Sequence, residues 1–245
     1  TVTYIAKDCA GNATQCVFDV TVLPTNLVTA TIELPGAVPG MRCIRFVNGT
    51  DCTDTTSLTL DFVDHDGMPS TPVRATTTDL ALACGSPGIV CAKDEQHSQW
   101  GTASLTLDGS VWDAGTITLP AGDNDNDGDV DINDVTLLIA QWMQPALNGG
   151  CPWDGTRDAD HNGDGIVDAA DYSLLTAQWL TATDCPCGLA PLGSEPARAT
   201  RDLPAAIAAR ADLDGNGIVD VRDVERFERR HGLDGSLSNA MRNTN

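Results

Sequence analysis

Three twelve-residue segments in the second half of the chain repeat one arrangement of acidic residues, glycine and valine. They begin at Asp123, Asp160 and Asp212. In each, oxygen-bearing side chains stand at positions 1, 3, 5, 9 and 12, glycine at position 6 and valine at position 8. Alternate side chains of a tight loop can point to one centre, and glycine allows the sharp turn that this requires. Much of this half must therefore consist of loops that gather carboxylates.

Gathered carboxylates repel one another until a cation lies between them, and a ligand set of oxygens favours Ca²⁺. Position 7 would offer its backbone carbonyl, position 9 would bind directly or through water, and the aspartate at position 12 would close the coordination sphere. We therefore expect about three Ca²⁺ ions, one per loop. The candidate ligands are Asp123, Asp125, Asp127, Asp129, Asp131, Asp134, Asp160, Asn162, Asp164, Ile166, Asp168, Asp171, Asp212, Asp214, Asn216, Ile218, Asp220 and Asp223.

An apolar pattern of helical spacing follows each loop. The first helix is marked by Val135, Leu138, Ile139 and Trp142, the second by Tyr172, Leu175 and Trp179, and the third by Val224 and Phe227. The tripeptide Ala-Gln-Trp recurs at 140–142 and 177–179. A chance aspartate-rich linker and a thrombospondin-type calcium repeat both lack such helices. The pattern favours calcium-binding units of one loop and one helix.

These loops and helices resemble the EF-hand-type repeats of dockerin type I modules, which also place Asp at position 12. A dockerin normally has two such units, whereas this chain has three, which begin 37 and 52 residues apart. In the family, positions 10 and 11 help to recognise the cohesin partner, often as a hydroxyl pair. Here they are Ile132-Asn133, Ala169-Ala170 and Val221-Arg222. The resemblance therefore implies calcium binding more strongly than it implies docking to a cohesin.

Short apolar segments separated by Gly and Pro fill residues 24–120 and predict β-strands. The candidates are 27–34, 41–47, 57–63, 73–78, 89–93, 103–107 and 116–119. Segments 42–46 and 91–97 resemble a β-module that precedes dockerin repeats in large secreted proteins of planctomycete-type bacteria. We expect a mainly β chain with a small α part: an immunoglobulin-like antiparallel β-sandwich over 24–120, followed by dockerin-like loop–helix calcium-binding repeats over 121–245.

Residues 1–23 predict a β-hairpin, because apolar and polar residues alternate on both sides of a turn at 8–12. Tyr4, Asp8, Gly11-Asn12, Cys16, Phe18, Val20 and Val22 resemble the last two strands of a hyalin repeat. A lone hairpin is marginal in water. These residues are therefore candidate donor strands that complete another sheet.

Nine cysteines are disulfide candidates: Cys9, Cys16, Cys43, Cys52, Cys84, Cys91, Cys151, Cys185 and Cys187. Their spacing matches no zinc site, so disulfides and an extracellular, secreted or cell-surface location are expected. Three pairs are close in sequence: Cys9 with Cys16, Cys43 with Cys52, and Cys84 with Cys91. A disulfide from Cys151 to Cys185 or Cys187 would link the two segments that flank the second repeat.

The remaining sequence features limit the classes of function that the chain can have. A net charge of -21 excludes nucleic acid as a partner, and no apolar run is long enough to span a membrane. Asp94, His97 and Ser98 lack the surroundings of a hydrolase site and are expected in a surface loop. His161 is expected to face solvent, and Trp100 and Trp112 to pack in a core rather than form a sugar platform. Asn12 and Asn48 begin glycosylation sequons.

The sequence favours a secreted, calcium-binding structural or interaction protein that is not an enzyme. Its first interpretation is a subunit of an extracellular assembly, such as a surface layer, fibre or tube, formed by self-assembly. The second is a dockerin-type anchoring module that binds a cohesin-like protein partner. The third is a non-catalytic part of a secreted polysaccharide-processing protein, with a glycan as its partner.

Overall fold

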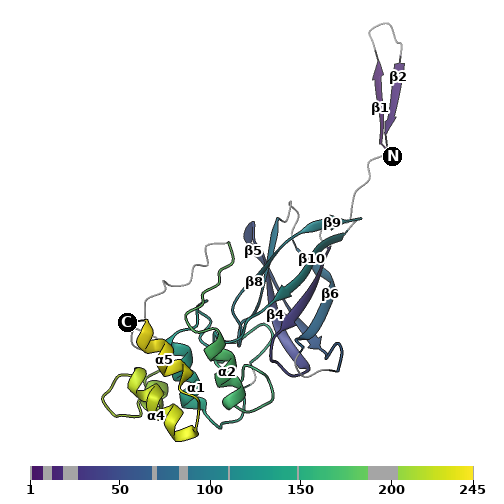
Figure 1. Ribbon diagram of the computed structural model, residues 1–245. Coiled ribbons are helices and arrows are strands. Elements are labelled where there is room, and N and C mark those ends of the chain that lie inside the picture. The colour runs from purple at the N-terminus through teal and green to yellow at the C-terminus, as the bar shows by residue number, and fades with distance from the viewer. Residues whose placement is uncertain are drawn as a thin grey trace.

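The computed structural model describes residues 2–7, 13–18, 27–67, 71–82, 88–109, 111–147, 149–186 and 204–244. In these residues strands come first and helices follow (Figure 1). The chain is mainly β with a smaller α part, as the sequence predicts. Among the described residues, no helix is both long and apolar enough to cross a membrane.

Two four-stranded sheets pack face to face in the N-terminal half. The first has the order β6-β3-β10-β9. Its strands are β3 (Leu27–Leu34), β6 (Val73–Ala81), β9 (Thr106–Asp108) and β10 (Val111–Thr118). The second has the order β5-β4-β7-β8. Its strands are β4 (Gly40–Asn48), β5 (Asp51–Phe62), β7 (Ile89–Asp94) and β8 (Gly101–Ser104).

The strand pattern explains the sandwich. In β3 every second residue is buried, so that Val28, Ala30 and Ile32 face the opposite sheet while the threonines between them do not. Ile44 and Phe46 of β4 enter the same core from the other sheet. One detail differs from the antiparallel expectation: β10 pairs with β3 in parallel. Between β3 and β10 the chain crosses to the second sheet and back twice, and β10 then runs in the same direction as β3.

The C-terminal half holds the loops and five described helices. They are α1 (Ile132–Gln141), α2 (Ala169–Ala177), α3 (Ala205–Ala211), α4 (Val221–His231) and α5 (Ser236–Asn243). The valines at loop position 8, Val130, Val167 and Val219, are all buried in one shared core. Trp142 and Phe227 meet edge to face at 4.6 Å between ring centroids. The three units therefore form one body.

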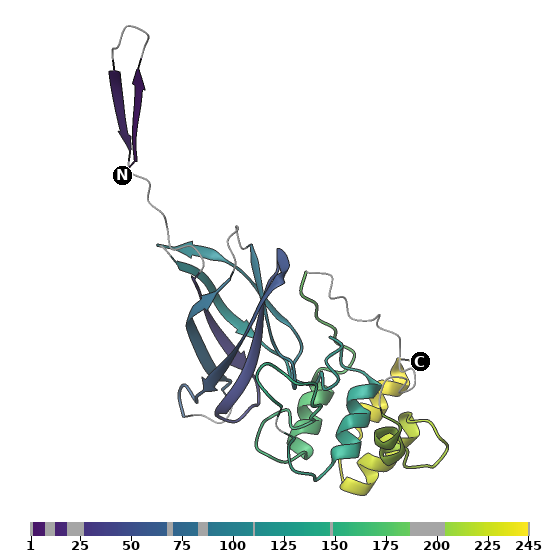
Figure 2. The ribbon, with the colours of Figure 1, turned by 180° about the vertical axis from the view of Figure 1, so that it is seen from behind.

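The helical half lies at one end of the sandwich (Figure 2). Two disulfides join the halves covalently. Cys43 of β4 is bonded to Cys151, and Cys91 of β7 to Cys185. The expected short-range pairs of Cys43 with Cys52 and Cys84 with Cys91 are therefore wrong, and so is the bridge between Cys151 and Cys185. Sequence proximity misleads here because adjacent strands carry Cys43 and Cys91 to the contact region between the two halves, which we call the seam. There the second half supplies partners 108 and 94 residues away.

The other cysteines are only partly described. Cys52 is disulfide-bonded. Cys9, Cys84 and Cys187 lie outside the described residues, as does the side chain of Cys16. Hydrogen bonds add to the seam: Val38 N donates to Asn162 O at 2.8 Å, and Gln99 Nε2 donates to Thr181 O at 2.7 Å.

The predicted hairpin is present as β1 (Val2–Lys7) and β2 (Ala13–Phe18). Val2 lies opposite Phe18, and Lys7 opposite Ala13. Within the described part of the chain these strands pair with each other and with no third strand. The turn between them, with Asn12, lies outside the described residues.

Candidate metal centres

The three acidic loops share one hydrogen-bond pattern, which begins at position 1. The first aspartate accepts a bond from the backbone N–H of the position 6 glycine through its Oδ2 atom. The distances are 2.9 Å for Asp123 and Gly128, 2.9 Å for Asp160 and Gly165, and 2.8 Å for Asp212 and Gly217. The same carboxylate also accepts, through Oδ1, the N–H of position 5 in every loop. Each loop thus wraps around its first side chain.

The aspartate at position 12 ties the end of each loop to its start. In the first loop Asp134 Oδ2 accepts from Asp131 N at 2.8 Å and Asp134 Oδ1 accepts from Asn124 N at 2.6 Å. In the third loop Asp223 accepts in the same way from Asp220 N and Leu213 N. In the second loop Asp171 accepts from Asp168 N and from Asn162 N, which is position 3 rather than position 2. The position 9 aspartate in turn caps the following helix in a reciprocal capping box. The loop and the helix therefore form one unit.

Glycine is required at position 6 by backbone geometry. Gly128, Gly165 and Gly217 have φ angles of 99°, 100° and 85°, a region that side chains with a Cβ rarely adopt. Position 4 is also left-handed, with Asn126 in the first loop and glycine in the others. These turns bring positions 1, 3 and 12 together.

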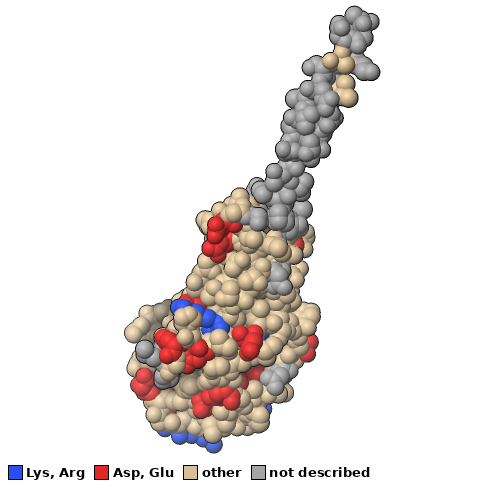
Figure 3. Space-filling view, turned by 90° about the vertical axis from the view of Figure 1, so that its right-hand side faces the viewer, with Lys and Arg blue, Asp and Glu red and all other residues tan. Residues whose placement is uncertain are grey.

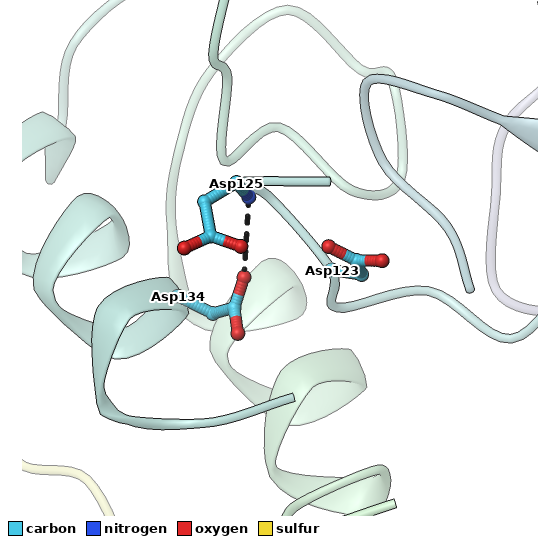
Figure 4. A group of neighbouring side chains, drawn as sticks. All are labelled: Asp123, Asp125 and Asp134. Carbon is cyan, nitrogen blue, oxygen red and sulfur yellow. Dashed lines mark hydrogen bonds between the residues drawn. The ribbon is translucent and has the colours of Figure 1, made fainter. Parts of the chain in front are cut away.

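Carboxylates converge in the first and third loops. Asp123, Asp125 and Asp134 place oxygen atoms within 4.8 Å of one another, and Asp212, Asp214 and Asp223 do the same. Figure 4 shows the first group, in which Asp125 N donates to Asp134 Oδ1 at 3.3 Å. A second group in the first loop joins Asp129 and Asp131 to Asp134. In the second loop Asn162 supplies an amide oxygen where the other two loops have an aspartate.

The protonation energetics of the first loop favour a cation. Burial and the neighbouring carboxylates Asp127 and Asp123 raise the pKa of Asp125 to about 8. Burial and the neighbouring carboxylates of Asp127, Asp131 and Asp123 raise the pKa of Asp129 to about 7. Oδ1 of Asp125 and Oδ1 of Asp129 are buried without a hydrogen-bond partner among the described residues. A hard divalent cation fits these atoms, because it would accept their lone pairs and neutralise their charge.

Lys93 adds a cation that the sequence pattern does not reveal. Its ammonium lies 2.5 Å from Asp123 Oδ2, and both side chains are almost fully buried. Lys93 belongs to β7 of the sandwich, so this ion pair crosses from one half of the protein to the other. Lys93 contacts the oxygen that also receives the Gly128 N–H. The one signal in the sequence is a lysine that directly follows the apolar residues 89–92 of its strand, which indicates a buried partner without identifying it.

The third loop differs in its surroundings. The short helix α3 precedes it, so this unit has helix–loop–helix order, which the predicted unit of loop and one helix did not include. Arg222 Nη2 donates to Asp220 Oδ2 at 2.7 Å, and Arg222 Nε lies 3.8 Å from Asp214 Oδ2. This cation partly offsets the acidic charge beside the third loop. Figure 3 shows acidic side chains gathered over the end of the molecule that holds the helices.

Several minor expectations need correction. His161 does not face solvent, because it lies at the seam with 3 % exposure, and burial, with smaller contributions from His97 and Arg42, lowers its pKa to about 3. Asn48 is buried, with Oδ1 accepting bonds from the backbone and the hydroxyl of Thr50, so it is unsuitable as a glycan acceptor in the folded chain. Asn48 is buried because strand β4 ends inside the sandwich. His161 is buried because the second loop rests against the sandwich.

Asp94, His97 and Ser98 are buried at the seam and do not form a surface loop. His97 Nδ1 lies 3.1 Å from Asp94 Oδ2, but the Ser98 hydroxyl donates to the carbonyls of Asp94 and Gln99. No hydrogen bond of the described residues joins Ser98 to His97. Trp100 packs in a small buried cluster, and Trp112 packs partly against the sandwich core, as expected.

Comparison with known protein families agrees with the repeated pattern of the loops. The family model of the dockerin type I domain, a calcium-binding family, matches residues 121–180. A solved structure of a type II cohesin–X-dockerin complex from Acetivibrio cellulolyticus is similar at a TM-score of 0.41 and 13% identity, covering 64% of this chain and 97% of that chain. No curated protein matches the chain. The family match covers the first two loops and ends before the third.

Proposed function

We propose that this chain is a calcium-stabilised, non-catalytic docking protein that acts outside the cell. Its C-terminal residues 121–245 would hold three Ca²⁺ ions and present a protein-binding surface, and its residues 24–120 would form the sandwich that carries them. The observation that carries the proposal is the repeated loop geometry, in which position 1 accepts from position 6 and position 12 closes all three loops, and positions 1, 3 and 12 converge in the first and third. The disulfides at the seam support an oxidising, extracellular setting.

The ligands in each loop follow from position. Side-chain oxygens at positions 1, 3, 5 and 12 would bind directly, the position 7 carbonyl of Asp129, Ile166 or Ile218 would complete the set, and position 9 would bind directly or through water. Bound Ca²⁺ supplies charge neutralisation and a fixed loop conformation. The chain itself orients the carboxylates through the glycine turns and the capping boxes.

Calcium binding is testable by titration calorimetry on chelator-treated protein. We expect three sites. The variants Asp123→Ala, Asp160→Ala and Asp212→Ala should each remove one of them, and Asp113→Ala, on β10 away from the loops, should remove none. Uptake of fewer than three ions by the wild type, or three ions in all loop variants, would contradict the assignment.

The partner in this proposal is a cohesin-like protein. The match of residues 121–180 to the dockerin family supports it, and positions 10 and 11 supply the candidate contact surface. Ala169, Ala170 and Arg222 are exposed, whereas Ile132 is buried. Docking would therefore use the second and third units rather than the first.

Surface plasmon resonance with a panel of immobilised cohesin modules tests this docking. We expect binding in calcium, none in EGTA, and at least tenfold weaker binding by Ala170→Arg. The matched variant Ser173→Arg, one turn further along α2, should retain more of the affinity. Absence of binding to every cohesin, with all three calcium sites filled, would refute the cohesin-like partner and leave calcium binding standing.

A second candidate role is that of a subunit in an extracellular assembly. Its support is the hairpin β1–β2, which pairs with no other described strand and could add to the sheet of a neighbouring molecule. Deletion of residues 1–23 should abolish assembly seen by electron microscopy while calcium binding persists. Assemblies that form equally well without this segment would exclude strand addition by the hairpin.

A further inference from the structure

Lys93 of β7 stands beside the first acidic loop and faces one of its carboxylates. The ammonium lies 2.5 Å from Asp123 Oδ2, and the two side chains are 1 % and 0 % exposed. The same ammonium lies 5.7 Å from the centre of the Trp100 ring. Because burial removes the ammonium from water, the groups around it must balance its charge, and Asp123 does so as an ion pair at hydrogen-bond distance.

The position 1 carboxylate has a different third partner in the first loop than in the others. In all three loops it accepts the backbone N–H groups of positions 5 and 6. In the second and third loops it also accepts the N–H of the position 4 glycine, at 2.9 and 2.7 Å. In the first loop Lys93 donates to Asp123 and brings a full positive charge. A neutral N–H leaves the carboxylate charge available to a metal ion, whereas an ammonium already offsets it.

The third loop also has a cation beside it, but an exposed one. Arg222 pairs with Asp220 Oδ2 at 2.7 Å and lies 3.8 Å from Asp214 Oδ2, while 60 % of its side chain is exposed. Water and salt screen such a surface pair, so it changes the free energy of the loop little. The charge of Lys93, in contrast, acts on Asp123 with much less screening, because both groups are buried.

The first loop also needs a counter-charge more than the other loops do. It carries six aspartates, whereas each of the other two carries four. Asp123 and Asp134 are fully buried, and Oδ1 of Asp125 is buried without a hydrogen-bond partner among the described residues. Carboxylates gathered in this way repel one another when no cation is present. Lys93 offsets one of these charges whether or not a metal ion is bound, because its strand belongs to the sandwich.

We propose that Lys93 is a built-in counter-ion of the first loop, which holds this loop closed without metal and lowers its affinity for Ca²⁺. The ion pair stabilises the metal-free loop, so part of the stabilisation that an ion would supply is present beforehand. With Ca²⁺ bound, the ion and the ammonium share one carboxylate and repel each other. Both effects weaken binding at this loop alone, so the sandwich sets the calcium concentration at which it fills. The inference rests on the proposed calcium binding by the first loop.

Calorimetric calcium titration of the full chain tests this inference, with the first loop identified by the binding constant that Asp123→Ala removes. Lys93→Met should raise the affinity of that loop by about tenfold or more, because the competing charge is gone. Lys93→Gln, which keeps an N–H donor without a charge, should act in the same way. The other two binding constants should stay within about threefold of the wild type in both variants.

Arg45→Met is the matched control. Arg45 lies opposite Lys93 on the neighbouring strand β4, but it pairs with Glu95 at 2.8 Å rather than with a loop carboxylate. All three binding constants should therefore stay within about threefold of the wild type. A purely structural role for Lys93 predicts the opposite sign, since the loss of a buried pair destabilises the fold and would weaken calcium binding or leave it unchanged.

A measurement on unaltered Lys93 decides the outcome if neither variant folds. The chain has two lysines, Lys7 and Lys93, so labelling with ¹⁵N-lysine gives two side-chain signals in NMR spectra, and Lys7→Gln assigns them. The Lys93 ammonium signal should shift as the first loop fills and should stay constant while the other two loops fill.

Two results would overturn the role of Lys93: a first-loop affinity that is unchanged or lower in the folded variants, or an ammonium signal that does not move when the first loop fills. Either result together with three bound ions would leave the proposed function standing. If Asp123→Ala takes up as many ions as the wild type, the calcium site of the first loop is refuted, and this inference falls with it.

Discussion

At the scale of single residues, Lys93 illustrates how one side chain connects the two halves. Its ammonium and the Asp123 carboxylate are both removed from water at the seam. The net contribution of such a pair to folding stability is small, because desolvation offsets much of the attraction. Removing one partner, however, leaves a buried charge unpaired. The pair therefore makes the first acidic loop sensitive to a change in the sandwich.

Lys93→Met should lower the free energy of unfolding by about 3–5 kcal/mol, because the Asp123 carboxylate loses its buried counter-charge. Urea denaturation in excess EGTA measures this effect, because bound Ca²⁺ would itself supply Asp123 with a counter-charge. Arg74→Met breaks the half-exposed pair with Glu33 and should cost about 0–1 kcal/mol, which makes it the control. Equal losses in the two variants would mean that Lys93 is not a buried partner of Asp123.

The crowded carboxylates also predict how pH acts on the calcium-free chain. The folded pKa values of Asp125 and Asp129, about 8 and about 7, lie above the ordinary value of 3.8. Between those limits the folded state binds more protons than the unfolded state, so stability is gained as pH falls and lost as pH rises. In EGTA the melting temperature should therefore increase from pH 8 to pH 5.5. Saturating Ca²⁺ should abolish this trend, and a calcium-free melting temperature that falls over the same range would contradict it.

At the scale of elements, the sequence predicted the positions of the loops better than it predicted the contacts that the elements make. Loop position and helix start are encoded locally, because Asp131, Asp168 and Asp220 serve as both loop residues and helix caps. The strands were also predictable where burial alternates, as in β3. The parallel pairing of β10 and the addition of α3 before the third loop were not, since both depend on segments distant in sequence.

Gly217→Ala tests the loop as an element. Its φ of 85° strains any residue with a Cβ, although a Cβ there would meet no neighbouring atom. The loss should therefore come from the backbone alone, at about 1–2 kcal/mol, together with weaker calcium binding at the third loop. Gly40→Ala, which also has open space but no positive φ, is the control. Unchanged calcium affinity in Gly217→Ala would show that the third loop does not need this turn.

At the scale of the whole molecule, three kinds of link join the sandwich to the loops: two disulfides, a buried ion pair and backbone hydrogen bonds. None of them could be predicted from the sequence, because a cysteine or a lysine carries no local mark of a partner that lies between 30 and 108 residues away. Long-range assembly, rather than local pattern, therefore determines what the two halves can do together.

This linkage predicts that removing calcium weakens the entire chain. An ion at about 100 times its dissociation constant adds roughly 2.7 kcal/mol, which for a chain of this size is about 5–11 °C of melting temperature per site. Excess EGTA should therefore lower the calorimetric melting temperature markedly, with sandwich and loops still melting together. In Cys43→Ser/Cys151→Ser, which removes a crosslink worth about 2–5 kcal/mol, the same chelation should separate the two halves into distinct transitions. An unchanged melt in EGTA would exclude calcium as a structural element, and one transition in the chelated double variant would place the coupling in the remaining contacts.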